Sequence, residues 1–436
     1  MRAMSFCNGR VLVAAFGLAM ASAPAIGAVD PAGAARVFGE ARTICQRDAG
    51  ALWGHSLCGP MLLVDPTDRS IVANQADAHG ALRATGAVFT GTLPASEIVA
   101  NTSITWSGVH WSQIMWPLPQ DAARRHVMLA HEMFHRIQPE LGMATHEGDN
   151  QHMDTLEGRY LLQLEWRALA EALRAPTDAA RRAAIDDALL FRQERYLRFP
   201  AAAANENALE SNEGVAEYTG VRLGLDTPQA RRDYALQDLS AFVRAPTFVR
   251  SFAYATGPAY GLLLDQADPA WRGKLRSGQR LDQLLATALR LPAPAFDTLA
   301  AREKVYDDGS LRASEVQREQ ARQARLAALK AKLVDGPVLA LPLLHESHQF
   351  NPQTLQPLGE YGTAYPTMRL SDDWGVLEVE DGILLGRQQA TVSAVGADPA
   401  GLKGPGWKLQ LNPGWSVAPG TRKGDLVVRH ADGASH

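Results

Sequence analysis

The feature that most constrains the fold is the pentapeptide His-Glu-Met-Phe-His at residues 131–135. It lies in an apolar, helix-like pattern that runs from about residue 120 to residue 138 and ends at Pro139. Residues four positions apart on a helix share one face, so His131 and His135 can point their imidazoles at a single metal ion. Glu132 lies on the same turn, where its carboxylate can reach a water molecule beside that metal. Random placement gives this pattern on the order of 0.015 times in such a chain, so we interpret it as a catalytic zinc site.

A catalytic zinc site usually has three protein ligands and one open position. Two later acidic residues are candidates for the third ligand: Glu157, 22 positions after His135, and Glu213, 78 positions after it. Glu213 is the second residue of the sequence Asn-Glu-Gly-Val-Ala-Glu-Tyr. This sequence resembles the second zinc-binding helix of the gluzincin metallopeptidases, which include the thermolysin-like enzymes. The pentapeptide resembles the first motif of the same family. The resemblance implies that Glu213 is the third zinc ligand and that Glu217 orients a ligand histidine.

A further segment extends the resemblance. The sequence Tyr-Ala-Thr-Gly-Pro-Ala-Tyr runs from Tyr254 to Tyr260 and is similar to a Tyr-x-x-Gly helix start in these enzymes. The family tyrosine donates a hydrogen bond to the oxyanion of the tetrahedral intermediate, so Tyr254 takes that role by position, with Tyr260 as the alternative. The resemblance also implies a peptide or protein substrate, a zinc ion that lowers the pKa of a bound water toward about 7, and Glu132 as general base. It covers roughly residues 100–270, and the two ligand segments lie farther apart than in the family's short helical hairpin.

Two other histidines and two other classes of protein are the alternatives to this interpretation. His146 and His152 lie in a polar segment, where we expect them in solvent or at a cleft rim rather than on the metal. A di-iron helix bundle is excluded because it needs a second Glu-x-x-His element and the sequence has none. The remaining alternative is a non-catalytic exported protein with structural zinc, whose C-terminal tryptophans would bind a ligand. These tryptophans are Trp374, Trp407 and Trp415, and core packing is the simpler expectation for them.

The N-terminal residues 1–28 predict a removed signal peptide, with two arginines, a short apolar run and small residues near a cleavage site. No second apolar run of that length follows, so we expect no membrane span after its removal. Its two arginines account for a change in net charge from −4 to −6, an acidic balance that does not favour nucleic acid. Cys45 and Cys58 remain as an even pair, which predicts a disulfide and a periplasmic or secreted protein.

The distribution of apolar residues predicts an α+β fold. Short β-prone runs occupy residues 60–117. Helical patterns follow at about 120–138, 153–174, 177–198 and 204–223, and residues 228–334 stay mostly helical. We expect a zincin-like metallopeptidase domain over residues 29–335, with a short N-terminal β region and a helical bundle carrying the zinc site. Residues 336–436, rich in glycine, proline and tryptophan, predict a small all-β domain.

Overall fold

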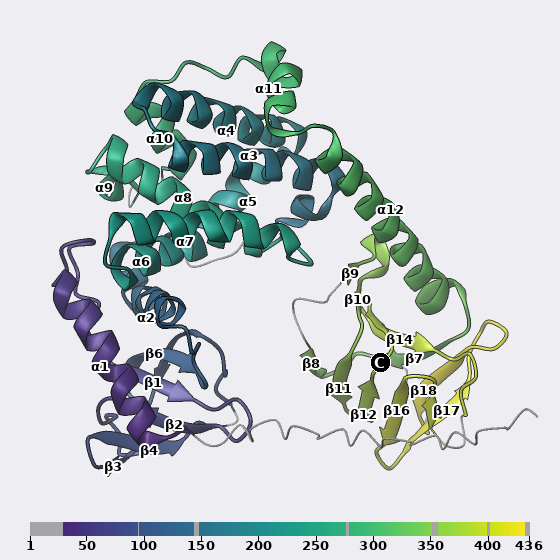
Figure 1. The fold of residues 1–436 in the computed structure, drawn as a ribbon. Helices are drawn as coiled ribbons and strands as arrows, with labels where there is room; N and C mark the ends of the chain where they lie inside the picture. The colour runs from purple at the N-terminus through teal and green to yellow at the C-terminus, as the bar shows by residue number, and fades with distance from the viewer. Residues whose placement is uncertain are drawn as a thin grey trace, which may run out of the picture. The chain divides into compact units, whose positions relative to one another are not determined.

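The computed structural model describes residues 29–94, 96–143, 148–275, 279–350, 356–398 and 402–431. The chain divides into two compact units, residues 1–137 and 138–436. Helices and strands both contribute, and strands predominate from residue 338 onward (Figure 1). The expected mixed α+β class with a C-terminal β region is therefore confirmed. The expected signal peptide lies outside the described residues, and none of the helices described is both long and apolar enough to cross a bilayer.

The first unit contains a six-stranded sheet with the order β3-β4-β2-β1-β6-β5. Its strands are β1 (Met61–Val64), β2 (Ser70–Ala73), β3 (Arg83–Thr85), β4 (Val88–Thr92), β5 (Thr102–Trp106) and β6 (Val109–Met115). Strand β6 pairs in parallel with β1 and antiparallel with β5. The turn between β5 and β6 consists of Ser107 and Gly108, with φ of 47° and 75°, the left-handed conformation that suits a tight hairpin.

Helices α1 (Pro31–Asp48) and α2 (Ala122–Ile137) complete the first unit, and α2 packs against α1, β5 and β6. Cys45, near the end of α1, forms the predicted disulfide with Cys58. The loop closed by this bond contains Trp53, whose ring centroid lies 5.2 Å from that of Phe134 in α2. The disulfide therefore closes a loop that packs on the helix carrying the pentapeptide.

The second unit begins with a helical region, drawn in blue to green in Figure 1. Thr155, Thr177 and Thr227 each cap a helix by accepting a hydrogen bond from a backbone N–H three residues later. The helices are α3 (Leu156–Arg174), α4 (Asp178–Arg198), α5 (Ala202–Leu209), α6 (Val215–Gly224), α7 (Pro228–Ala241), α8 (Ser251–Ala267), α9 (Trp271–Leu275), α10 (Leu281–Leu289), α11 (Leu299–Tyr306) and α12 (Ser310–Lys330). Short 3-10 segments include η1 (Gln138–Leu141) and η2 (Gln151–Asp154).

The single helix expected over residues 204–223 is interrupted, which corrects the sequence interpretation. A π-helical turn, η3 (Glu210–Gly214), lies between α5 and α6. Helix α8 packs directly on this turn, because Gly257 approaches it without a side chain. A Cβ atom on Gly257 would lie 2.0 Å from the carbonyl oxygen of Gly214, so only glycine permits this contact. Single π turns of this kind are rare and often occur at functional sites.

Charged side chains are buried where α3, α4 and α5 meet. The Arg192 guanidinium donates to Glu165 at 2.7 Å and to both carboxylate oxygens of Glu210 at 2.6 and 2.9 Å. The Arg195 guanidinium binds Glu206 in the same bidentate manner, at 2.7 and 2.8 Å. All five side chains are at most 1% exposed. Desolvating them is costly, so the paired geometry is what keeps these charges inside the bundle.

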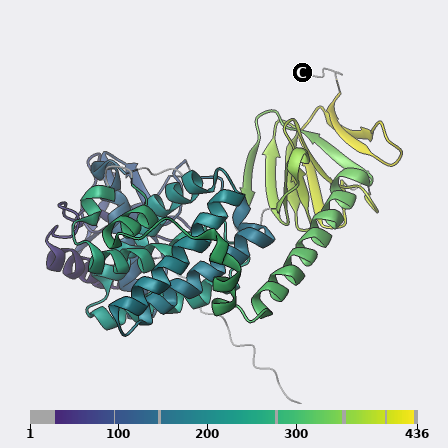
Figure 2. The ribbon, with the colours of Figure 1, turned by 90° about the horizontal axis from the view of Figure 1, so that it is seen from above.

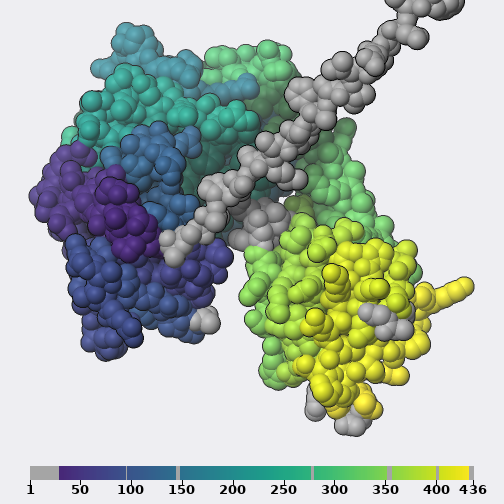
Figure 3. Space-filling model, turned by 60° about the horizontal axis from the view of Figure 1, so that its bottom comes forward, coloured from purple at the N-terminus to yellow at the C-terminus, as the bar shows by residue number. Residues whose placement is uncertain are grey.

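The C-terminal β region consists of two sheets that share one apolar core. The first has the order β17-β18-β7-β14-β13-β10-β9 and the second the order β15-β16-β12-β11-β8. Leu341, Leu370, Trp374, Leu377 and Trp407 are among the core residues, which come from both sheets. Figure 2 shows these strands beyond the end of α12, and Figure 3 shows the region in yellow-green as a compact body. The strands are β7 (Val338–Pro342), β8 (Ser347–Phe350), β9 (Gln356–Pro357), β10 (Thr363–Tyr365), β11 (Met368–Asp372), β12 (Gly375–Val379), β13 (Ile383–Leu385), β14 (Gln389–Ser393), β15 (Lys403–Gly404), β16 (Trp407–Leu411), β17 (Trp415–Pro419) and β18 (Leu426–His430).

Two of the three C-terminal tryptophans are core residues. Trp374 is fully buried and its indole N–H donates to the carbonyl of Pro342 at 2.8 Å. Trp407 is 4% exposed and donates to the carbonyl of Ser393 at 2.8 Å. Trp415 is half-buried and packs against the same core. The simpler expectation of core packing therefore holds for Trp374 and Trp407.

Candidate metal centre

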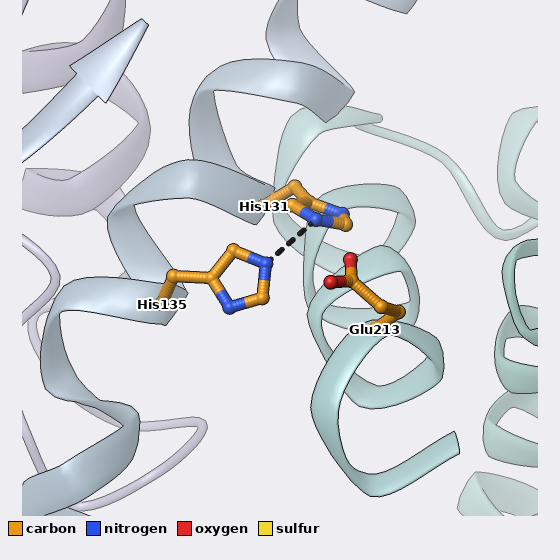
Figure 4. Close-up of side chains that lie close together, drawn as sticks. All are labelled: His131, His135 and Glu213. Carbon is orange, nitrogen blue, oxygen red and sulfur yellow. Dashed lines mark hydrogen bonds between the residues drawn. The ribbon is translucent and has the colours of Figure 1, made fainter. Parts of the chain in front are cut away.

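Helix α2 places the two motif histidines one turn apart on the same face. Nε2 of His131 lies 3.0 Å from Nε2 of His135, so the two rings converge through the same nitrogen atom (Figure 4). His131 is 5% exposed, and His135 is half-buried. The side chain of Asp121 accepts a hydrogen bond from the backbone N–H of Arg124 and so starts the helix. Pro139 follows its end, as the sequence predicts.

Glu213 in the π turn is the third member of the group. One ligand atom from each of His131, His135 and Glu213 lies within 4.8 Å of the others. Figure 4 shows the Glu213 carboxylate directed toward the two imidazoles from a different helix. Glu213 is 8% exposed, so the group is largely shielded from water.

The donor set fits a divalent metal ion. Two imidazole nitrogens and one carboxylate oxygen are ligands that such ions accept together. Zinc–nitrogen bonds of about 2.0–2.1 Å in a tetrahedral arrangement would place two imidazole nitrogens about 3.3 Å apart. The observed separation of 3.0 Å between the two Nε2 atoms is close to that value. The group can therefore hold a metal ion.

Three neighbouring side chains contact the Glu213 carboxylate. Tyr254 donates its hydroxyl hydrogen to Oε2 of Glu213 at 2.6 Å. The Asn212 amide donates to Oε1 at 3.3 Å, and the Arg250 guanidinium lies 3.4 Å from the same oxygen. The sequence interpretation did not include Asn212 as a functional residue, although it precedes Glu213 in the quoted pattern, and it missed Arg250. No motif signals Arg250, which reaches the site only because α8 begins beside the π turn.

The residues expected to act in catalysis have these positions. Glu132 lies in α2 between the two histidines and is 4% exposed. Glu217 lies in the first turn of α6 and is half-buried. Burial raises the pKa of the Tyr254 hydroxyl, and the charge and hydrogen bond of Glu213 and the charge of Glu217 raise it further, so this hydroxyl stays protonated and acts as a donor.

The alternative site residues have other partners. Glu157 pairs with Arg198 at 2.5 Å and also binds Arg312, so it is engaged outside the group formed with the histidines. Tyr260 is fully buried and donates to Glu165 at 2.8 Å within the buried charged cluster.

His152 does not lie in solvent, which was one of the two places expected for it, and it is not part of the group formed by His131, His135 and Glu213. Its side chain is 9% exposed, and its Nε2 lies 2.9 Å from Oε1 of Glu206, because η2 directs the ring toward α5. His146 lies outside the described residues.

Comparisons with known proteins add no relative to this description. No protein-family model, no curated protein and no solved structure matches the chain. The resemblance to gluzincin metallopeptidases therefore stays an expectation carried by the motifs. The structure adds to it a largely buried group of two histidines and one glutamate that can bind a metal ion.

Proposed function

We propose that this protein is an exported zinc-dependent hydrolase that cleaves peptide bonds, with a zincin-like core. The observation that carries the proposal is the convergence of His131, His135 and Glu213, whose ligand atoms lie within 4.8 Å of one another. Two histidines and a glutamate form a characteristic ligand set of catalytic zinc sites in peptidases.

The composition of the group favours a catalytic site over a structural one. Structural zinc sites are usually closed by four protein ligands and are rich in cysteine. Here the group described has three members and no cysteine, and an acidic residue, Glu132, lies next to one of the ligands. Cys45 and Cys58 are bonded to each other, so they are not metal ligands.

In the proposed reaction each side chain has a separate task. Zinc bound by the three ligands would supply a Lewis acid that activates water at neutral pH. Glu132 would accept a proton from the attacking water and pass it to the leaving amine. Tyr254 would donate its hydroxyl hydrogen to the substrate carbonyl oxygen as that oxygen gains negative charge. Glu217 would act indirectly, by orienting a ligand histidine.

Export is proposed from the expected signal peptide together with the disulfide. A bond between Cys45 and Cys58 is compatible with an oxidising compartment such as the periplasm or the medium. The described residues contain no helix able to span a membrane, and the acidic balance of the chain does not favour nucleic acid as partner.

Metal content tests the proposal most directly. The wild type, purified without chelator, and the variants Glu213→Ala and Glu157→Ala are analysed by mass spectrometry for bound metal. We expect one zinc per chain in the wild type and in Glu157→Ala, and none in Glu213→Ala. Zinc lost in Glu157→Ala and kept in Glu213→Ala would refute Glu213 as ligand. A wild type that neither retains nor rebinds zinc would refute the hydrolase and favour the non-catalytic binding protein.

A further inference from the structure

The side chain of Gln138 lies against the π turn that carries Glu213. Its amide nitrogen, Nε2, donates to two consecutive carbonyl oxygens of that turn, Ser211 at 3.0 Å and Asn212 at 3.3 Å. Gln138 is fully buried. It is also the first residue after α2, three positions beyond the candidate ligand His135. The residue that binds the turn is thus linked to a ligand histidine by a short stretch of backbone.

A π turn offers carbonyl groups that a side-chain donor can bind. A π-helical turn shifts backbone hydrogen bonding from i→i+4 to i→i+5, so a carbonyl group near the transition can lose its usual partner. Buried carbonyl groups are nearly always hydrogen-bonded, and here a side-chain amide supplies two donors. The bonded carbonyls belong to the two residues immediately before Glu213, so the contact fixes the backbone from which the Glu213 side chain departs.

Other contacts hold the same turn on different sides. Arg192 binds both carboxylate oxygens of Glu210, the first residue of the turn. Gly257 meets the backbone of Gly214, its last residue. Gln138 acts between these two points, at the centre of the turn.

We propose that Gln138 is a positioning residue for the metal site: by binding the carbonyls of Ser211 and Asn212, it sets the direction of the Glu213 carboxylate. This inference rests on the proposed zinc site. It assigns Gln138 no contact with metal or substrate. Partners that orient metal ligands typically affect metal affinity by about 10–100-fold, so the effect is large enough to measure.

The test compares two buried glutamines. Gln138→Met keeps the length of the side chain and removes both donors. The matched control is Gln113→Met, because Gln113 in β6 is also fully buried and donates to two backbone carbonyls, Ile98 and Ala100, each at 2.9 Å. Zinc affinity is measured on the full chain with Zn²⁺ alone, by competition with a chromogenic chelator. Far-UV circular dichroism and thermal unfolding in chelator report the fold without metal.

We expect Gln138→Met to weaken zinc binding by about 10–100-fold and Gln113→Met to leave it unchanged, with both variants less stable than the wild type. Equal zinc affinity in wild type and Gln138→Met would overturn the inference while leaving the zinc site intact. Equal weakening in both variants would also overturn it, because the effect would then follow from general destabilisation. If Gln138→Met does not fold, Gln138→Asn decides: it keeps the donors on a shorter stem, and unchanged zinc affinity would contradict the proposal. A wild type without zinc affinity would instead refute the proposed function itself.

Discussion

The hydroxyl group of Tyr254 in α8 donates a hydrogen bond to Oε2 of Glu213 in the π turn across 2.6 Å. We expect Tyr254→Phe to keep one zinc per chain and to lower kcat by about 10²–10³-fold, the usual cost of removing one donor to a developing oxyanion. Tyr260→Phe is a matched control, because it removes another buried hydroxyl that is bonded to a glutamate. Loss of zinc in Tyr254→Phe would show that this hydroxyl orients the ligand and not the substrate.

Glu132 should be required for turnover but not for metal binding. We expect Glu132→Gln to retain zinc, because the three ligands are unchanged. We expect its kcat on a peptide library to fall by about 10²–10⁴-fold. Metal analysis and kinetics on the same preparation check both parts. Near-wild-type activity in this variant would refute the proposed mechanism.

Arg192 should matter more for stability than any exposed arginine. Arg192→Met leaves the carboxylates of Glu165 and Glu210 buried without this partner, so we expect a loss of about 3–5 kcal/mol in the free energy of unfolding. Urea unfolding measures this loss. Arg174→Met, which breaks an exposed pair with Glu171, should cost less than about 1 kcal/mol. Similar losses in the two variants would contradict the importance of the buried cluster.

The stability of the fold should fall in acid, in part through Glu206. Burial by itself raises the pKa of this carboxyl, but the charge and hydrogen bonds of Arg195, with a hydrogen bond from His152, outweigh burial and lower the pKa from 4.5 to about 2. The charged form therefore stabilises the fold: its contribution is complete above about pH 4.5 and is lost as the pH falls through about 2.

This contribution is about 3 kcal/mol. Urea unfolding in chelator at pH 5.5 and at pH 2.5 should show a larger loss of stability in the wild type than in Glu206→Gln, which has no titrating carboxyl at this position. An equal loss in both proteins would assign the acid sensitivity to other groups.

The disulfide should stabilise the first unit. It joins cysteines 13 positions apart, and closing a loop of that size contributes about 3 kcal/mol by the chain-entropy argument. We expect the double variant Cys45→Ser/Cys58→Ser to lose about that much in urea unfolding, and the wild type to lose the same amount in reductant. If reductant affects the double variant as strongly as the wild type, its effect does not come from this bond.

Local patterns predicted the elements that bear the site. Apolar periodicity indicated the helix that became α2, and the spacing of His131 and His135 indicated that they share a face, since both properties depend only on helical geometry. The disulfide followed from an even pair of cysteines. The sequence favours Glu213 over Glu157 through the flanking residues alone. In the structure Glu157 pairs with Arg198 and Arg312.

Features that depend on tertiary contacts were not predictable. The π turn breaks a segment whose composition is that of one continuous helix, and it lies against Gly257, some forty residues away. Charged residues usually lie at the surface, so the sequence did not indicate that Glu165 and Arg192 are buried. For the same reason it did not indicate the hydrogen bond between His152 and the buried Glu206.

The contact between Gly214 and Gly257 sets the distance between the two segments that carry Tyr254 and Glu213. With no Cβ atom at Gly257, the two helices touch backbone to backbone, and α8 and the π turn are separated by little more than the thickness of their main chains. Tyr254 and Glu213 extend from these same two segments. A hydrogen bond tolerates a variation of only about half an ångström between heavy atoms, which is less than the width of one methyl group. Two residues without side chains thus act as the spacer for two residues whose side chains meet.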